Sequence, residues 1–172
     1  MSSETNIKQM VKEEVDKYLK ELGFPVKEEK VGFEDDEIFL LSIEEYEKYK
    51  DIIPHINHWC WLRSQGSHCL YASGVYGNGG VNDIGSIVDD MDAAIRPVIK
   101  LDMIGNDYIH GDYEPGDRVI MHSFPWIYLG DDIAIAEVPI AFDMFDEQNN
   151  QYSTSKVRDF LNQWLNVRKL YC

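Results

Sequence analysis

Apolar residues recur at helical spacing in two segments of the chain, one near each end. In residues 4–22 they stand three or four positions apart and so form one stripe along a helix. This helix should end at Gly23, because Pro25 blocks its continuation. Ser155 is a favourable N-cap for a final helix that runs to about Leu165. The first stripe contains Ile7, Met10, Val11, Val15, Tyr18, Leu19 and Leu22, and the second contains Val157, Phe160, Leu161, Trp164 and Leu165.

Residues 42–50 carry a more local helix signal, because the start of this helix is specified in the sequence. Ser42 is followed three positions later by Glu45, the capping-box pattern in which each side chain accepts a hydrogen bond from the other residue's backbone N–H. Leu41 and Tyr46 stand where a hydrophobic staple would join the preceding turn to the helix. These signals predict a helix that is fixed at its N-terminus.

Short apolar segments bounded by turn residues predict the strands. Hairpin-turn residues occupy 78–80 (Asn-Gly-Gly), and turn residues at 124–125 (Phe-Pro) and 130–132 (Gly-Asp-Asp) separate later segments. Pro97 is tolerated in a strand only at an edge or a bulge, and 143–152 is a polar loop. We therefore expect two antiparallel meanders and an α+β fold. The predicted strands cover 37–41, 58–64, 71–76 and 94–102, then 118–122, 126–130 and 133–138.

Two arginines lie inside apolar runs, Arg63 in the strand over 58–64 and Arg96 in the strand over 94–102. Arginine is rarely buried without a partner. Each should therefore be bonded to a carboxylate or to backbone carbonyls. We predict structural roles for both arginines and for Trp59, Trp61, Trp126 and Trp164.

The first half of the chain resembles a bacterial and phage domain family of unknown function through three linked motifs. They read FLLSIEEYEKY (39–49), WCWLRSQGS (59–67) and AAIRPVIKLD (93–102). The family pattern is roughly FLLS-x-EE, WWLRSPG and GVRPAL, and its order and spacing agree with residues 37–102. The final R-P-hydrophobic strand is also similar to the last strand of C-type-lectin-like domains. The resemblance implies an antiparallel, C-type-lectin-like sheet core with two or three flanking helices.

The chain departs from this family pattern at three positions. Cys60 stands between the two tryptophans, Gln65 replaces a proline, and Ile95 occupies a position where the family has valine. Asn82-Asp83 is similar to a lectin calcium pair, but a dipeptide in a loop rich in glycine and asparagine has little specificity. The resemblance implies a scaffold used without calcium.

The second half resembles the part of the same family that normally comes first. Residues 116–132 read GDRVIMHSFPWIYLGDD and residues 152–166 read YSTSKVRDFLNQWLN, which are similar to segments that precede the FLLS motif in full-length members. The chain is then either a circular permutant or one partner of a swapped dimer. This inference predicts one shared core that contains Trp126, Trp164 and either Trp59 or Trp61.

The domain organisation follows from these motifs. We expect an N-terminal amphipathic helix over 1–24 and a single α+β domain over 33–166, built from the halves 33–102 and 116–166 with a linker over 103–117. The apolar stripe of the first helix must be buried somewhere. Docking on the domain and pairing with a second copy would each bury this stripe. The apolar pattern is too short to decide between the two.

The charge of the chain is strongly negative and uneven. The formal net charge is −15 at pH 7, and the first 30 residues nearly balance, so almost all the excess lies in the domain. Binding to nucleic-acid phosphates is disfavoured, because it needs lysine and arginine to neutralise them. The negative charge is compatible with a basic partner, with mimicry of nucleic acid, and with a surface that is acidic only for solubility.

The cellular setting is predicted from apolar runs and cysteines. No apolar run approaches the ~20 residues of a membrane span, and the acidic, polar N-terminus is unlike a signal peptide. Cys60, Cys69 and Cys172 do not form an even set, which favours a reduced, cytoplasmic setting. Cys60 and Cys69 can either bridge or stand as two partly buried thiols.

No catalytic constellation is evident, so we predict no enzyme activity, no cofactor and no metal. Histidines 55, 58, 68, 110 and 122 fit no zinc signature. The chain has no glycine-rich phosphate loop with a lysine, no nucleophile elbow, and no Cys–His pair in a family context.

Two functions from different classes fit the chain. The first is a non-catalytic, lectin-like binding module, a phage or mobile-element accessory protein that presents loops of 73–91 to a protein or glycan. The second is a small acidic inhibitor of a nucleic-acid-binding host enzyme, whose carboxylates stand in for phosphates. Neither binds nucleic acid or membrane directly, and a homodimer suits both. Because tyrosine and asparagine are favoured contact residues, the candidate ligand-binding residues are Tyr71, Tyr76, Asn78, Asn82 and Asp83.

Overall fold

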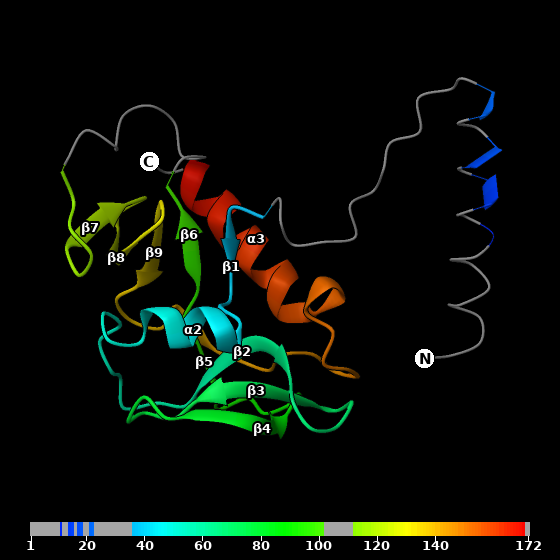
Figure 1. Ribbon diagram of the computed structural model, residues 1–172, viewed down its shortest axis with the longest axis horizontal. Coiled ribbons are helices and arrows are strands. Elements are labelled where there is room, and N and C mark those ends of the chain that lie inside the picture. The colour runs from blue at the N-terminus through cyan, green and yellow to red at the C-terminus, as the bar shows by residue number, and fades with distance from the viewer. Residues whose placement is uncertain are drawn as a thin grey trace. The chain divides into compact units, whose positions relative to one another are not determined.

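The chain divides into two units, Met1–Gly32 and Phe33–Cys172. The computed structural model in Figure 1 describes residues 11, 14–15, 17–18, 21–22, 36–101 and 112–170. In the first unit, residues 11, 14–15, 17–18 and 21 are helical, as predicted, and the Leu22 N–H donates to the Tyr18 carbonyl at 3.1 Å. The rest of the predicted helix, including Ile7, Met10 and Leu19, lies outside the described residues. So do residues 23–35 and 102–111, with His110 and most of the linker predicted over 103–117, and Cys172.

In the described part of the second unit, ten strands form two sheets of five, and all strand pairs but one are antiparallel. The first sheet has the order β1 (Ile38–Phe39), β6 (Val98–Lys100), β9 (Ile133–Ala136), β8 (Phe124–Gly130) and β7 (Arg118–Met121). The second has the order β10 (Ala141–Phe142), β5 (Ala94–Ile95), β2 (Cys60–Gln65), β3 (Tyr71–Val75) and β4 (Val81–Ile87). Two α-helices, α2 (Ile43–Tyr49) and α3 (Lys156–Leu170), and a 3-10 turn, η2 (Tyr152–Thr154), complete the unit. The predicted α+β fold is confirmed.

Helix α2 begins where the sequence predicts. The Glu45 N–H donates to Ser42 Oγ at 3.1 Å, and the Ser42 N–H donates to Glu45 Oε2 at 2.9 Å, which completes the capping box. Figure 1 shows α2 between the two sheets, where it packs beside β2. The predicted helix is therefore confirmed, and its N-terminus is held by two reciprocal bonds.

Helix α3 is also capped as predicted, but by two residues instead of one. The Arg158 N–H donates to Ser155 Oγ at 3.2 Å. Asp146 adds a second acceptor, since its Oδ2 receives the Lys156 N–H at 3.0 Å. The helix runs to Leu170, beyond the predicted end near 165, and lies beside β1 (Figure 1).

The strand predicted over 94–102 is wrong in one respect, because it is two strands in different sheets. Pro97 lies between β5 and β6, where it needs no ladder N–H. β5 pairs with β2 in parallel, Cys60 opposite Ala94, and this is the exception to the antiparallel arrangement. The segment around Arg96 therefore carries the chain from one sheet to the other.

Two loop or turn assignments are also corrected. Residues 81–87, predicted within the loops of 73–91, form strand β4. The turn placed at 124–125 lies instead at His122 and Ser123, whose φ angles of 50° and 55° suit a tight hairpin turn, and Phe124-Pro125 begins β8. The loop predicted over 143–152 is observed up to residue 151, and it contains the fully buried Phe145.

Both sheets require both halves of the chain. β6 from the first half pairs with β9 from the second, and β5 pairs with β10. Trp61 and Trp126 are fully buried in one hydrophobic cluster, and Trp59 and Trp164 pack against it. The prediction of a shared tryptophan core is therefore confirmed.

Candidate functional site

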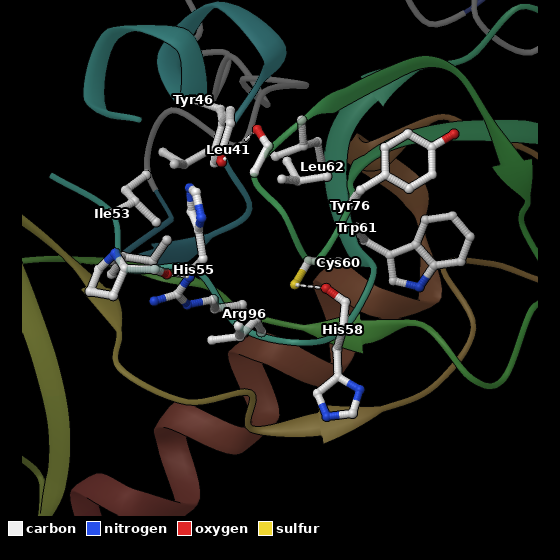
Figure 2. Close-up of a pocket in the computed structure, with 15 residues that line it drawn as sticks. Leu41, Tyr46, Ile53, His55, His58, Cys60, Trp61, Leu62, Tyr76 and Arg96 are labelled. Carbon is white, nitrogen blue, oxygen red and sulfur yellow. Dashed lines mark hydrogen bonds between the residues drawn. The ribbon is translucent and has the colours of Figure 1, made fainter. Parts of the chain in front are cut away.

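A small cavity of about 30 Å³ opens where the two sheets meet α2 (Figure 2). Its apolar wall comes from α2, from the loop that follows this helix and from both sheets. Six polar or titratable side chains also line it, those of Tyr46, His55, His58, Cys60, Tyr76 and Arg96. The apolar lining includes Leu41, Ile53, Trp61, Leu62, Val75 and Ile135, and Tyr76 stands at the edge.

One wall of the cavity is fixed by a contact between α2 and the β3–β4 turn. The hydroxyl of Tyr46 donates to the Gly79 carbonyl at 3.1 Å. Gly79 has a φ of +86°, and a Cβ added there would collide with the ring of His55. The position therefore needs glycine both for its backbone conformation and for the close approach of His55.

Arg96 places a positive charge beside this cavity. Its side chain is 8% exposed and is bonded only to backbone carbonyls within the described residues: Nε to Ala136 at 2.8 Å, Nη1 to Pro54 at 2.7 Å and Nη2 to Glu137 at 3.5 Å. The expectation of carbonyl partners is confirmed. Burial lowers the pKa of Arg96 from its ordinary value, but an arginine remains charged at neutral pH.

Arg63 has a different environment, although it also lies in an apolar run. It forms a two-armed ion pair with Glu45, with Nη2 2.8 Å from Oε1, and Nη1 also donates to the Leu40 carbonyl at 2.8 Å. Burial raises the pKa of Glu45, but the bonds from Arg63 and Ser42 outweigh it, and the net pKa is lowered. Arg63 is neutralised by a carboxylate, whereas Arg96 donates its hydrogen bonds to neutral backbone carbonyls.

The Cys60 thiol faces the cavity but is not an activated nucleophile. Burial raises its pKa to about 11, although Arg96 acts in the opposite direction. The thiol lies 3.6 Å from the His58 carbonyl, and the His58 ring packs edge-on against Phe142 at 4.9 Å. At neutral pH the thiol is therefore protonated.

Both described cysteines are free, Cys60 being buried and Cys69 exposed. Over the part of the chain that the structure describes, no three His, Cys, Asp or Glu side chains gather closely enough to share a metal ion.

The five predicted ligand-binding residues lie on β3, β4 and their turn, but not at one point. Tyr76 and Asn78 belong to the turn, and Asn82 and Asp83 follow on β4. Tyr71 pairs with Ile87 at the far end of β3. Tyr76 is the member of this set that lines the cavity, and it is 49% exposed.

The turn itself is held rigidly by its own backbone and side chains. The Tyr76 N–H donates to the Gly80 carbonyl at 2.8 Å, and the Gly79 N–H donates to the Tyr76 carbonyl at 2.8 Å. Asn78 Oδ1 accepts from the Gly80 N–H at 3.0 Å. Asn78 is therefore engaged in shaping the turn that presents Tyr76.

Sequence reasoning did not assign Tyr46, His55 or Ile53 to a site. Their meeting in one cavity has no local signal, because their common surface forms only when α2 packs against the turn. The one available signal was Arg96, since a cation in an apolar run requires acceptors from elsewhere in the fold.

Comparisons of the chain with protein-family models, with curated proteins and with solved structures gave no match. None of the described helices has the length and apolar character needed to cross a membrane.

Proposed function

We propose that the protein is a non-catalytic binding module that recognises a protein partner through the Tyr76 turn and the adjoining cavity. The observation that carries the proposal is the position of Tyr76. It is a half-exposed tyrosine at the edge of a partly apolar cavity, on a turn held by Tyr46 and Asn78. Rigid aromatic anchors beside a pocket concentrate binding energy at little entropic cost. A glycan is the alternative ligand of the same surface.

The chemistry of the cavity supports binding and not catalysis. The high pKa of Cys60 leaves little thiolate, and the His58 ring is packed against Phe142. Nucleophilic catalysis needs a base that touches the nucleophile. The group that His58 presents to Cys60 is its backbone carbonyl.

The family resemblance gives this proposal its wider setting. A permuted, C-type-lectin-like domain of phage or mobile-element origin would pair strands from its two halves, and the pairs β6–β9 and β5–β10 are compatible with that arrangement. The free thiols of Cys60 and Cys69 suit a cytoplasmic protein.

The test compares two tyrosines at opposite ends of β3, Tyr71 at its start and Tyr76 directly after its last residue. The full-length protein and its Tyr76→Ala and Tyr71→Ala variants are used as bait in an extract of the native host, and captured proteins are identified by mass spectrometry. We expect a specific partner that the native protein and Tyr71→Ala retain and that Tyr76→Ala loses by at least tenfold. A partner retained equally by all three would refute the proposed surface.

The net charge of −15 supports a second candidate, an acidic inhibitor of a nucleic-acid-binding enzyme. Charge mimicry predicts a basic partner whose affinity falls steeply as ionic strength rises, because the Debye length shortens. The affinity of the captured partner, measured between low and high salt, separates the two candidates. Insensitivity to salt together with dependence on Tyr76 favours the binding module.

A further inference from the structure

Arg96 brings a buried positive charge to the cavity, and among the described residues no carboxylate is hydrogen-bonded to it, although the negative charge of Glu137 acts on it through space. A guanidinium has five N–H donors, and the bonds to the carbonyls of Ala136, Pro54 and Glu137 use three of them. The carboxylate of Glu137 is directed to Arg118, whose Nε lies 2.6 Å from Oε2. A buried cation is costly unless it is paired. The cavity therefore has the electrostatic character of an anion site.

The dimensions of the cavity restrict what that anion is. A volume of about 30 Å³ is far below the several hundred Å³ of sites for whole small molecules. It accommodates one functional group inserted from outside. A single cation matches one negative charge, and the planar guanidinium fork matches a carboxylate, whereas a phosphate carries more charge and needs further donors. Figure 2 shows Arg96 passing below His55, with Cys60 on one side and Ile53 on the other.

We propose that the cavity binds the side-chain carboxylate of a glutamate or aspartate inserted by a partner protein, with Arg96 as its counterion. The apolar side chains of Ile53, Leu62 and Ile135 suit a methylene stem. A chain terminus would bring a backbone N–H that needs an acceptor. The carbonyls of Pro54 and Gly79 already accept bonds from Arg96 and Tyr46, so that N–H would have to share an acceptor. The side-chain carboxylate is therefore favoured over a terminal one.

This assignment rests on the proposed function and makes it more specific. The domain surface is acidic, so an acidic partner would be repelled at long range, but that repulsion is screened beyond about 10 Å in 0.1 M salt. The fitting partner has a neutral or basic surface with one acidic side chain as its anchor. Tyr76, at the edge of the cavity, would then pack against the residues beside that anchor.

The first test uses small probes on the isotopically labelled full-length protein. Propionate represents the carboxylate and its stem, and propionamide is the neutral control of the same shape. NMR titration should give saturable shifts at the Arg96 Nε–H and the Ile53 and Ile135 methyl groups, with propionate at least tenfold tighter than propionamide. Equal affinity for the two, or shifts confined to other parts of the protein, would overturn the assignment.

Three further probes identify the source of the carboxylate. N-acetylglutamate α-amide carries only a side-chain carboxylate, N-acetylalanine only a terminal one, and inorganic phosphate neither. We expect the glutamate derivative to bind at least tenfold more tightly than the other two. Tighter binding of N-acetylalanine or phosphate would refute the side-chain assignment.

Substitution of the arginine provides the matching variant. Arg96→Gln should weaken propionate binding at least tenfold and Arg96→Lys less, whereas Arg168→Gln, a cation on α3 outside the cavity lining, should leave it unchanged. Unchanged binding in a folded Arg96→Gln variant refutes the role of Arg96. If that variant does not fold, the propionate and propionamide comparison on the native chain still decides the matter.

The two proposals fail separately. If propionate does not bind but Tyr76→Ala loses the captured partner, the carboxylate site is refuted and the binding module stands. If propionate binds as expected while the partner is indifferent to Tyr76, the anion site stands and the recognition surface must be placed elsewhere.

Discussion

Tyr46 and Gly79, 33 residues apart, are joined by one hydrogen bond of 3.1 Å from the tyrosine hydroxyl to the glycine carbonyl. The bond fastens helix α2 to the β3–β4 turn and so fixes one wall of the cavity. At one end of this connection is the capping box of α2, and at the other is the turn that presents Tyr76. The position of the candidate recognition residue is thus tied to the start of a helix distant in sequence.

Tyr46→Phe should remove this connection with little change in packing. Losing one partner of a partly buried hydrogen bond costs about 1 kcal/mol of unfolding free energy, and urea denaturation measures it. Tyr71→Phe is the control, because among the described residues no partner is found for its hydroxyl, and it should change stability by less than about 0.5 kcal/mol. Equal effects would mean that the bond to Gly79 contributes nothing.

Gly79→Ala should be more destabilising than Gly80→Ala, although the two residues are adjacent. At Gly79 the φ of +86° disfavours any side chain, and the new Cβ meets the His55 ring. We expect a loss of about 1–3 kcal/mol. Gly80 has no positive φ, and its new Cβ would lie 3.2 Å from Asn78 Oδ1, which needs to shift by only a few tenths of an ångström, so the cost should stay near 0.5 kcal/mol. Thermal and urea unfolding of both variants checks this, and similar losses would contradict it.

The parts of the fold that could be predicted are those whose causes are local. Ser42 with Glu45 specifies the start of α2, and Ser155 caps α3, because each acts within three residues of itself. Strand β4 was missed because Asn82, Asp83 and Gly85 are depleted in strands and are tolerated here only through pairing with β3.

The cavity could not be predicted, because its parts meet only in the folded chain. Arg96 could be assigned carbonyl partners in general, but Pro54 and Ala136 as the partners follow from how the sheets pack. Pro97 could be placed at an irregularity, yet its role in passing the chain between two sheets depends on which strands flank it. Long-range contacts decide these features, and a single sequence carries no local signal for them.

Glu45→Gln should lower stability in a pH-dependent way. The pKa of Glu45 is lowered in the folded protein, because Arg63 and Ser42 outweigh its burial. A lowered pKa gives stability that is present above the ordinary value of 4.5 and is lost as pH falls through the folded value. The variant should therefore be less stable by about 1–2 kcal/mol near neutral pH, with the difference shrinking below pH 4.5.

Urea denaturation of the native protein and of Glu45→Gln, from neutral pH to below pH 4.5, measures this difference in unfolding free energy. Glu47→Gln serves as its control, since the pair of Glu47 with Lys50 is solvent-exposed and adds little. A difference that is constant with pH, or that grows on acidification, would contradict the assignment to the Arg63 pair.

Asp146→Ala should destabilise the docking of α3 more than its position in a polar loop suggests. Asp146 is 9% exposed, its Oδ1 accepts the Gln148 N–H at 2.8 Å, and its Oδ2 accepts the Lys156 N–H at the helix start. Removing a buried carboxylate that satisfies backbone donors at a helix N-terminus costs about 2–3 kcal/mol. The neighbouring Glu147→Ala should cost less than about 0.5 kcal/mol, because its ion pair with Lys156 is exposed. Urea unfolding followed by tryptophan fluorescence measures both, since Trp164 lies on α3, and equal losses would show that Asp146 does not fix the helix.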